Sequence, residues 1–198
     1  MTDRPINERL ILSLYDATGN WAQPYIKAGY PVMLWDKSVE GDIMDFNAVE
    51  AWLSGYYDFV YGILAAPPCD HFAASGARWW KDKDEETIDM AIALAEMVNV
   101  LRQQCDNVVF WALENPVGRI EKLCPWLKPY RKLSFDPCQY GETYTKKTIL
   151  WGEFNAALPQ TPVLALDGSK MHNMSSSAKA KRSATPMGFA NAFFKANQ

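Results

Sequence analysis

Two residues of this chain have the chemistry of a covalent catalyst, and each follows a short apolar run. Cys69 comes after a Pro-Pro pair that stops the run Phe59–Ala65, and Glu114 follows the run Val108–Leu113. A thiolate is a strong nucleophile, and a carboxylic acid can hydrogen-bond or protonate a group that gains charge. A buried structural cysteine is the alternative for Cys69. Its position on a rigid turn favours the catalytic interpretation, and the pair predicts covalent catalysis with an acid partner.

The two apolar runs are typical of strands buried inside a parallel sheet, because they are apolar along almost their whole length. The carboxyl ends of parallel strands meet at one edge, where open α/β sheets place their ligand crevices. Cys69 and Glu114 are therefore expected at the same edge. Strands alternate with helices over the first two thirds of the chain, which predicts an α/β fold with a doubly wound, mainly parallel sheet.

A second pattern near the start of the chain is typical of nucleotide-bearing cofactors. The strands Leu10–Tyr15 and Pro31–Trp35 flank a glycine-containing turn, Asp16–Asn20, and a helix, Gln23–Ala28. Asp36 follows the second strand. In such a layout the backbone approaches the cofactor at the turn and the carboxylate binds ribose hydroxyls. An ordinary surface acid is the alternative for Asp36.

A long helix follows the Cys69 region. Asp82 or Asp84 can cap it, and it extends to about Arg102 with apolar residues at helical spacing that belong to the core. The other expected elements are the helical stretch Phe46–Leu53, the strands Lys132–Phe135 and Lys146–Trp151, and the helix Pro186–Ala196.

Basic residues are interleaved with Trp126 and Tyr130 between Arg119 and Lys132. This mixture can form a surface that binds phosphates and stacks bases. A solvated basic surface over buried rings would give the same pattern. Both interpretations stay open from the sequence.

Composition limits the class of protein. The 198 residues are 48% hydrophobic, enough for one sizeable core, so we expect a single domain over residues 1–198 with a loop-rich insert at about 153–182. A net charge of −3 does not indicate a general nucleic-acid binder, so any such contact must come from local patches.

The cysteines and histidines show no metal-site spacing, and a reducing compartment fits them best. No apolar run is long enough to cross a bilayer, and no targeting peptide is recognised at the start. We therefore expect a soluble, cytoplasmic protein without a metal or a membrane partner. The remaining cysteines, Cys105, Cys124 and Cys138, are interpreted as structural.

The order of these motifs resembles that of the cytosine-C5 DNA methyltransferases, particularly the small, phage-type members. Leu14–Asn20 stands at the glycine-rich first motif of that family, and Gly41-Asp42-Ile43 stands at a cofactor contact. Pro67-Pro68-Cys69 matches the nucleophile motif and Glu114-Asn115 the acid motif. Tyr144, Lys146 and Thr148 are in register with the family's Gln-x-Arg-x-Arg strand. The resemblance covers nearly the whole chain and implies a Rossmann-like fold of the S-adenosylmethionine-dependent methyltransferase type.

The resemblance also implies roles for individual residues. Cys69 would attack C6 of cytosine while Glu114 binds N3 and the exocyclic amine, so that C5 accepts a methyl group from S-adenosylmethionine. The implied catalytic residues are Cys69, Glu114 and Lys146. The implied cofactor-binding residues are Tyr15, Asp16, Thr18, Gly19, Asn20, Trp21, Asp36, Asp42, Ile43, Pro67 and Thr185. The implied substrate-binding residues are Pro68, Asn115, Pro116, Tyr144 and Thr148.

The chain departs from the family pattern in two respects that concern the substrate. Lys146 and Thr148 stand where the family has arginines, and only residues 153–182 stand where full-length members carry a target-recognition domain. DNA read with low sequence specificity, or single-stranded DNA, is therefore the expected substrate. Two alternatives remain: the same chemistry on a free pyrimidine nucleotide or RNA, and a methyltransferase-like binding protein without turnover.

Overall fold

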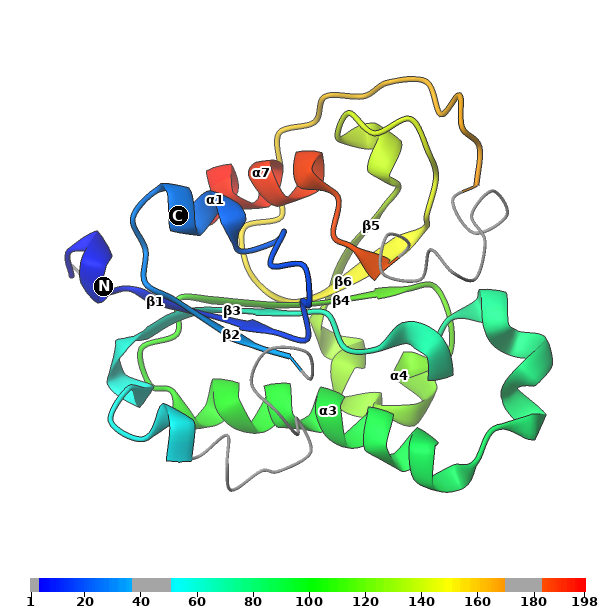
Figure 1. Ribbon diagram of the computed structural model, residues 1–198, viewed down its shortest axis with the longest axis horizontal. Coiled ribbons are helices and arrows are strands. Elements are labelled where there is room, and N and C mark those ends of the chain that lie inside the picture. The colour runs from blue at the N-terminus through cyan, green and yellow to red at the C-terminus, as the bar shows by residue number, and fades with distance from the viewer. Residues whose placement is uncertain (1–3, 37–50, 170–182) are drawn as a thin grey trace.

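The computed structural model describes residues 4–36, 51–169 and 183–198. These residues form a six-stranded sheet in the order β2-β1-β3-β4-β6-β5. Helices cover both faces of the sheet (Figure 1). The predicted α/β class is therefore confirmed.

The sheet is mixed. β1 pairs in parallel with β2 and β3, and β3 pairs in parallel with β4. β6 is antiparallel to both β4 and β5. The strands are β1 (Leu10–Leu14), β2 (Val32–Trp35), β3 (Val60–Ala65), β4 (Phe110–Pro116), β5 (Arg131–Phe135) and β6 (Thr148–Glu153).

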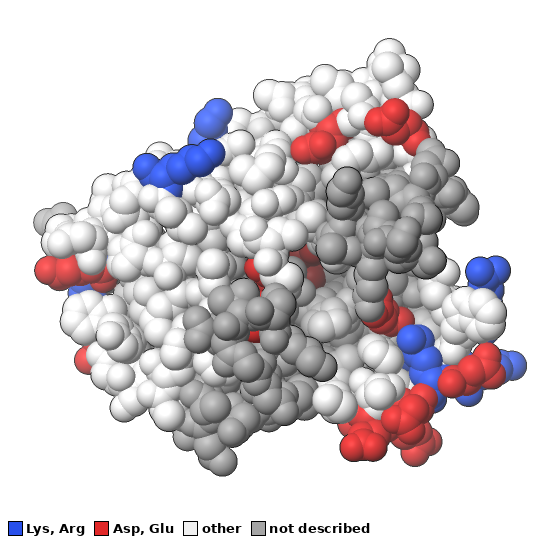
Figure 2. All heavy atoms as spheres, viewed as in Figure 1, with Lys and Arg blue, Asp and Glu red and all other residues white. Residues whose placement is uncertain are grey.

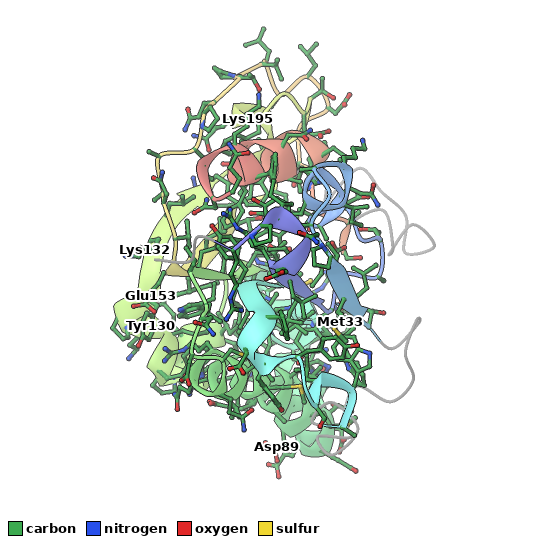
Figure 3. The ribbon with its side chains drawn as sticks, turned by 90° about the vertical axis from the view of Figure 1, so that its left-hand side faces the viewer. Met33, Asp89, Tyr130, Lys132, Glu153 and Lys195 are labelled. Carbon is green, nitrogen blue, oxygen red and sulfur yellow. The ribbon has the colours of Figure 1, made fainter. Side chains whose placement is uncertain are left out.

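Helices α3 (Glu85–Gln104) and α4 (Ile120–Leu123) lie on one face of the sheet, and α1 (Gln23–Lys27) and α7 (Met187–Ala196) lie on the other (Figure 1). Figure 3 shows the same layers from the side, with Lys195 of α7 and Asp89 of α3 on opposite sides of the sheet. Each face has its own apolar core. The sheet is therefore buried on both faces, which explains why its central strands are apolar along their length.

Helix α3 begins where its sequence signals predict. The Asp84 side chain accepts a hydrogen bond from the Thr87 backbone N–H at 3.1 Å, so Asp84 rather than Asp82 is the N-cap. Glu85 and Glu86 in the first turn suit the positive end of the helix dipole. The buried side of the helix is an apolar stripe that includes Ala91, Ala95, Val98 and Leu101.

Strand β4 corrects one sequence prediction. It was expected to end before Glu114, but it begins at Phe110 and continues to Pro116. The antiparallel neighbour β6 is the reason, because it pairs Glu114 with Leu150 and Asn115 with Ile149. Proline is tolerated at the end of the strand, where its missing N–H interrupts no further pairing. Glu114 is therefore held inside the sheet.

The basic and aromatic segment has its rings engaged within the protein. Trp126 and Tyr130 pack against Trp111 of β4, with ring centroids 5.9 and 5.1 Å away. The Arg102 guanidinium from α3 lies over all three rings, at 4.6 to 5.8 Å from their centroids. This geometry favours a solvated basic surface over packed aromatics, and not a base-stacking surface.

Three other predictions can be compared with the residues that the structure describes. Most of the predicted helix Phe46–Leu53 lies outside them, although residues 51–53 are helical. Residues 154–169 contain no helix or named strand, as expected for a loop-rich stretch. Within the described ranges, no helix is long and apolar enough to cross a membrane, and no group of three or more His, Cys, Asp or Glu side chains could hold a metal ion.

Candidate active site

The strand order reverses at β1, and this places a crevice at one edge of the sheet. The chain goes from β1 to β2 on one side, and then to β3 on the other side of β1. In open α/β sheets ligands bind outside the carboxyl ends of the strands at such a point. Tyr15 follows β1, Asp36 follows β2, and Pro67 to Cys69 follow β3 closely.

Two adjoining cavities lie at this edge. The first has a volume of about 330 Å³ and the second about 480 Å³. Both volumes are in the range of small-molecule sites. The residues common to the two cavities are Cys69, Asp70, Pro116, Lys146 and Ser183. Groups bound in the two cavities would therefore meet at Cys69 and Lys146.

Most of the residues expected from the sequence line the first cavity. They are Tyr15, Asp16, Thr18, Asp36, Pro67, Pro68, Cys69, Glu114, Asn115, Pro116 and Lys146. The thiol and the carboxyl group that motivated the catalytic interpretation are thus brought to one cavity. Asp42 and Ile43 lie outside the described residues.

The turn after β1 is shaped around the buried Asp16 carboxylate. This carboxylate accepts hydrogen bonds from Thr18 Oγ1 at 2.7 Å and from the Trp21 backbone N–H at 2.9 Å. Tyr15 and Gly19 both have positive φ, 65° and 64°, so the chain turns sharply on either side of Asp16. The turn therefore presents its polar groups to the first cavity.

Four of the expected cofactor contacts support this turn and do not line either cavity. The Gly19 backbone N–H donates to Asp16 O, and Asn20 Nδ2 donates to Thr185 O at 3.1 Å. The Trp21 side chain is fully buried and packs on two phenylalanine rings of α7. These residues position the turn, and a direct cofactor contact for them stays a prediction.

Cys69 is a partly buried thiol in the short 3-10 helix Cys69–His71. Burial raises its pKa above the ordinary value, and the Lys146 ammonium opposes this effect. The nearby carboxylates of Asp70 and Glu114 raise the pKa further. Since the thiolate is the nucleophilic form, Lys146 is the neighbouring side chain that favours reactivity.

Lys146 is a buried cation, with 8% of its surface exposed. No ion pair joins it to another residue in the part of the chain that the structure describes. Thr148 is also buried, and its hydroxyl donates to Lys146 O at 2.9 Å. Thr148 thus shapes the backbone that carries Lys146. Neither Thr148 nor Tyr144 lines a cavity, so a substrate contact for these two residues stays a prediction.

A buried hydrogen bond joins the two strand ends that carry the thiol and the acid. Asn115 Nδ2 donates to Pro67 O at 2.9 Å, and Asn115 is 1% exposed. Breaking this bond would leave buried polar atoms without partners. Asn115 is therefore a positioning residue that fixes the Cys69 turn relative to Glu114.

A second support for the Cys69 turn comes from residues 117–119. Gly118 forms a bridge with Ala73, and the Arg119 side chain donates to His71 O at 2.8 Å. A Cβ on Gly118 would lie 1.8 Å from Phe72 O. Only glycine permits this approach of the two backbones.

Gly118→Ala is therefore expected to destabilise the protein by about 1–3 kcal/mol, the usual cost of overpacking, and to reduce reactivity at Cys69. Urea unfolding measures the first effect. Gly76→Ala is the matched control, because its Cβ would have its nearest contact at 3.7 Å, on Asp70 O. Equal unfolding free energies for the two variants would contradict the close approach.

The second cavity contains several residues that the sequence did not single out. Ser75, Thr145, Lys147, Asp136 and Ser169 line it, and Lys147 Nζ lies 3.5 Å from Asp136 Oδ2. They come from distant segments of the chain and follow no common pattern. Asp70 lines both cavities, and its position next to Cys69 is the only sequence signal that could have identified it.

The first cavity is acidic. Its charged lining residues are Asp16, Asp36, Asp70, Glu114 and Lys146. Figure 2 shows acidic atoms in the recess at the middle of this face. Four carboxyl groups against one ammonium favour a ligand that carries positive charge and hydroxyl donors, and disfavour a polyphosphate.

No protein-family model matches this chain, and no curated protein matches it.

Proposed function

We propose that the protein transfers a methyl group from S-adenosylmethionine to C5 of cytosine in DNA, through a covalent bond between Cys69 and C6. The observation that carries the proposal is the wall shared by the two cavities. Because Cys69, Pro116 and Lys146 line both cavities, a base that enters through the second cavity would meet, beside the nucleophile, both the donor and Glu114 in the first. The reversal of strand order at β1 and the helices on both faces support a doubly wound, Rossmann-like methyltransferase fold.

The first cavity fits the proposed cofactor by the chemistry of its donors and acceptors. Asp36 would accept hydrogen bonds from the ribose hydroxyls, and the carboxylate of Asp16 suits a cation. When bound, S-adenosylmethionine supplies a methyl group on a positively charged sulfur. Tyr15 and Pro67 would provide apolar contact surface.

At the cytosine ring, the residues of this chain supply the activation. The Cys69 thiolate adds to C6, and the electron pair of the C5–C6 double bond shifts through C5 and C4 toward N3. The Glu114 carboxyl group stabilises the charge that develops at N3, which leaves C5 nucleophilic. After C5 accepts the methyl group, the C5 proton passes to solvent and its electron pair restores the C5–C6 double bond. The Cys69 thiolate then leaves C6, and Glu114 takes back the proton from N3.

Lys146 keeps the thiol reactive in this scheme. Without its ammonium, burial and the neighbouring carboxylates raise the pKa of Cys69 against only a backbone hydrogen bond at Cys69. Lys146→Met keeps an apolar side chain of similar length, so the charge is the main property that changes.

We expect Lys146→Met to slow alkylation of Cys69 by iodoacetamide at neutral pH by about tenfold for each unit by which the pKa rises. In the unsubstituted protein the alkylation rate should rise with pH and should still be rising at pH 9, because the pKa of Cys69 lies above its ordinary value of 9.0. Mass spectrometry of the Cys69 peptide follows the reaction. Lys132→Met, an exposed position on β5, is the control. Identical pH profiles for the two variants would remove Lys146 from this role.

One observation favours a second candidate substrate. The second cavity, at about 480 Å³, has room for a whole nucleotide as well as for a base, and the chain carries a net charge of −3. The same chemistry on a free pyrimidine nucleotide such as dCMP, or on RNA, is therefore the alternative.

Transfer of labelled methyl groups tests the proposal. Single-stranded DNA, duplex DNA, RNA and dCMP are offered in turn with labelled S-adenosylmethionine, and nucleoside analysis locates the label. Label at cytosine C5 in DNA supports the proposal, and label only in dCMP or RNA selects the alternative. Cofactor binding by calorimetry without transfer to any substrate would instead indicate a binding protein without turnover.

A further inference from the structure

A protruding segment that sequence reasoning passed over begins just after the Cys69 turn. It is the 3-10 helix η4, Ala74–Asp82, which contains two adjacent tryptophans. Figure 1 shows it between β3 and α3, projecting beyond the carboxyl edge of the sheet. Its residue Ser75 lines the second cavity, so the segment borders the proposed base site.

The two tryptophans have different surroundings. Trp80 is partly buried and lies under the Arg119 guanidinium, 4.5 Å from the ring centroid. Trp79 is 55% exposed. The Ala74 backbone N–H donates to Val117 O at 2.8 Å and ties down the start of the segment. Trp79 is therefore held at the surface by an anchored element.

Positive charge lies beside the exposed ring. The Arg78 guanidinium is 4.9 Å from the Trp79 ring centroid, and Lys81 is exposed in the same segment. Acidic side chains follow the segment: Asp82 ends it, Asp84 caps α3 through Thr87, and Glu85 and Glu86 lie exposed in the first turn of α3. Arg78 lies over the Trp79 ring, but Trp79 differs from Trp126 and Tyr130, which pack against Trp111, because its ring is largely exposed. An exposed ring with two cations in the same segment has the features of surfaces that stack bases and bind backbone phosphates.

We propose that Trp79 stacks on a base of a single-stranded polynucleotide, while Arg78 and Lys81 contact its phosphates. This proposal rests on the proposed function, because the target cytosine in the second cavity fixes where the strand starts. Trp79 comes four positions after Ser75, which is about 8 Å along a 3-10 helix. With about 3.4 Å between stacked nucleotides, the base on Trp79 is about two nucleotides from the target.

The geometry favours a single strand over the other partners. In a duplex both faces of each base are covered by its neighbours, whereas a single strand leaves them open to an aromatic ring. A free nucleotide held in the second cavity would not extend to Trp79. A protein partner, including a second copy of this chain, is the competing occupant, since tryptophan and arginine are also frequent at protein interfaces.

Fluorescence anisotropy with a labelled single strand of about 12 nucleotides, within the usual site size of such surfaces, tests the proposal. Trp79→Ala should weaken binding about 5- to 150-fold, as expected for the loss of one stacked base. Trp79→Phe should keep most of the affinity. Replacing Arg78 and Lys81 by glutamine should reduce the slope of log affinity against log salt by about 1.4.

Tyr56→Ala is the matched control, because Tyr56 is 50% exposed and precedes β3, at the opposite edge of the sheet. In methyl transfer, Trp79→Ala should raise KM for the long strand and leave kcat, and all transfer to dCMP, unchanged.

Equal affinities of Trp79→Ala and Tyr56→Ala, tighter binding of the duplex than of the single strand, or loss of self-association in Trp79→Ala would overturn the proposal. If no substrate is methylated while binding still depends on Trp79, the proposed function fails and the binding surface stands. If methylation is normal and Trp79→Ala binds the single strand as tightly as the unsubstituted protein, only the proposed binding surface is wrong.

Discussion

Cys69→Ala is expected to reduce methyl transfer by about 10⁴-fold or more, the scale seen when a covalent nucleophile is removed. Without the sulfur, no bond forms to C6 and C5 keeps its low reactivity. Cofactor affinity should change little by comparison, since the polar contacts of the first cavity come from other residues such as Asp16 and Asp36. The variant should therefore separate binding from chemistry.

A substrate analogue makes this expectation visible without turnover. In an oligonucleotide with 5-fluorocytosine at the target, offered together with S-adenosylmethionine, C5 accepts the methyl group but the fluorine cannot leave as the C5 proton does, so the bond to Cys69 persists. A shift in mass on a denaturing gel is expected for the unsubstituted protein and not for Cys69→Ala. Cys138→Ala is the matched control, because Cys138 is a partly exposed thiol that lines neither cavity. An adduct in Cys69→Ala would show that another group is the nucleophile.

Glu114→Gln is expected to lower kcat by about 10²- to 10⁴-fold, the usual contribution of a positioned acid or base. The amide keeps the size and the place in β4, but it cannot transfer a proton to N3 as negative charge develops there. The buried position of Glu114, 7% exposed, strengthens this difference, since water cannot substitute for the carboxyl group. Adduct formation with the 5-fluorocytosine strand should slow in parallel.

Glu153→Gln provides the comparison for this variant. Glu153 lies on β6 opposite Trp111, toward the other end of the same strand pair, and its carboxylate accepts a hydrogen bond from Trp111 Nε1 at 2.9 Å. An amide oxygen can still accept that bond, so activity should be kept. A comparable loss in both variants would point to sheet stability, and unfolding curves would show it. Unchanged turnover in Glu114→Gln would exclude an acid role for Glu114.

The sequence alone determined which strands form and what lies at their ends. The apolar runs before Cys69 and Glu114 are buried on both faces, so local composition is enough to identify them. Proline stops β3 at the expected place because of its own backbone chemistry. Parallel strands then bring the thiol and the acid to one edge without any knowledge of side-chain packing. The sequence limited the cap of α3 to Asp82 or Asp84, and the hydrogen bond from Thr87 identifies Asp84.

Only the tertiary structure decided how that edge is completed. β6 lies between β4 and β5 and extends β4 to Pro116, and the segment just before β6 brings Lys146 to Cys69. The second cavity is lined from segments more than sixty residues apart, such as Ser75 and Asp136. The division between an anchored Trp80 and an exposed Trp79 depends on Arg119. These features arise from strand order and long-range contacts, which local periodicity does not encode.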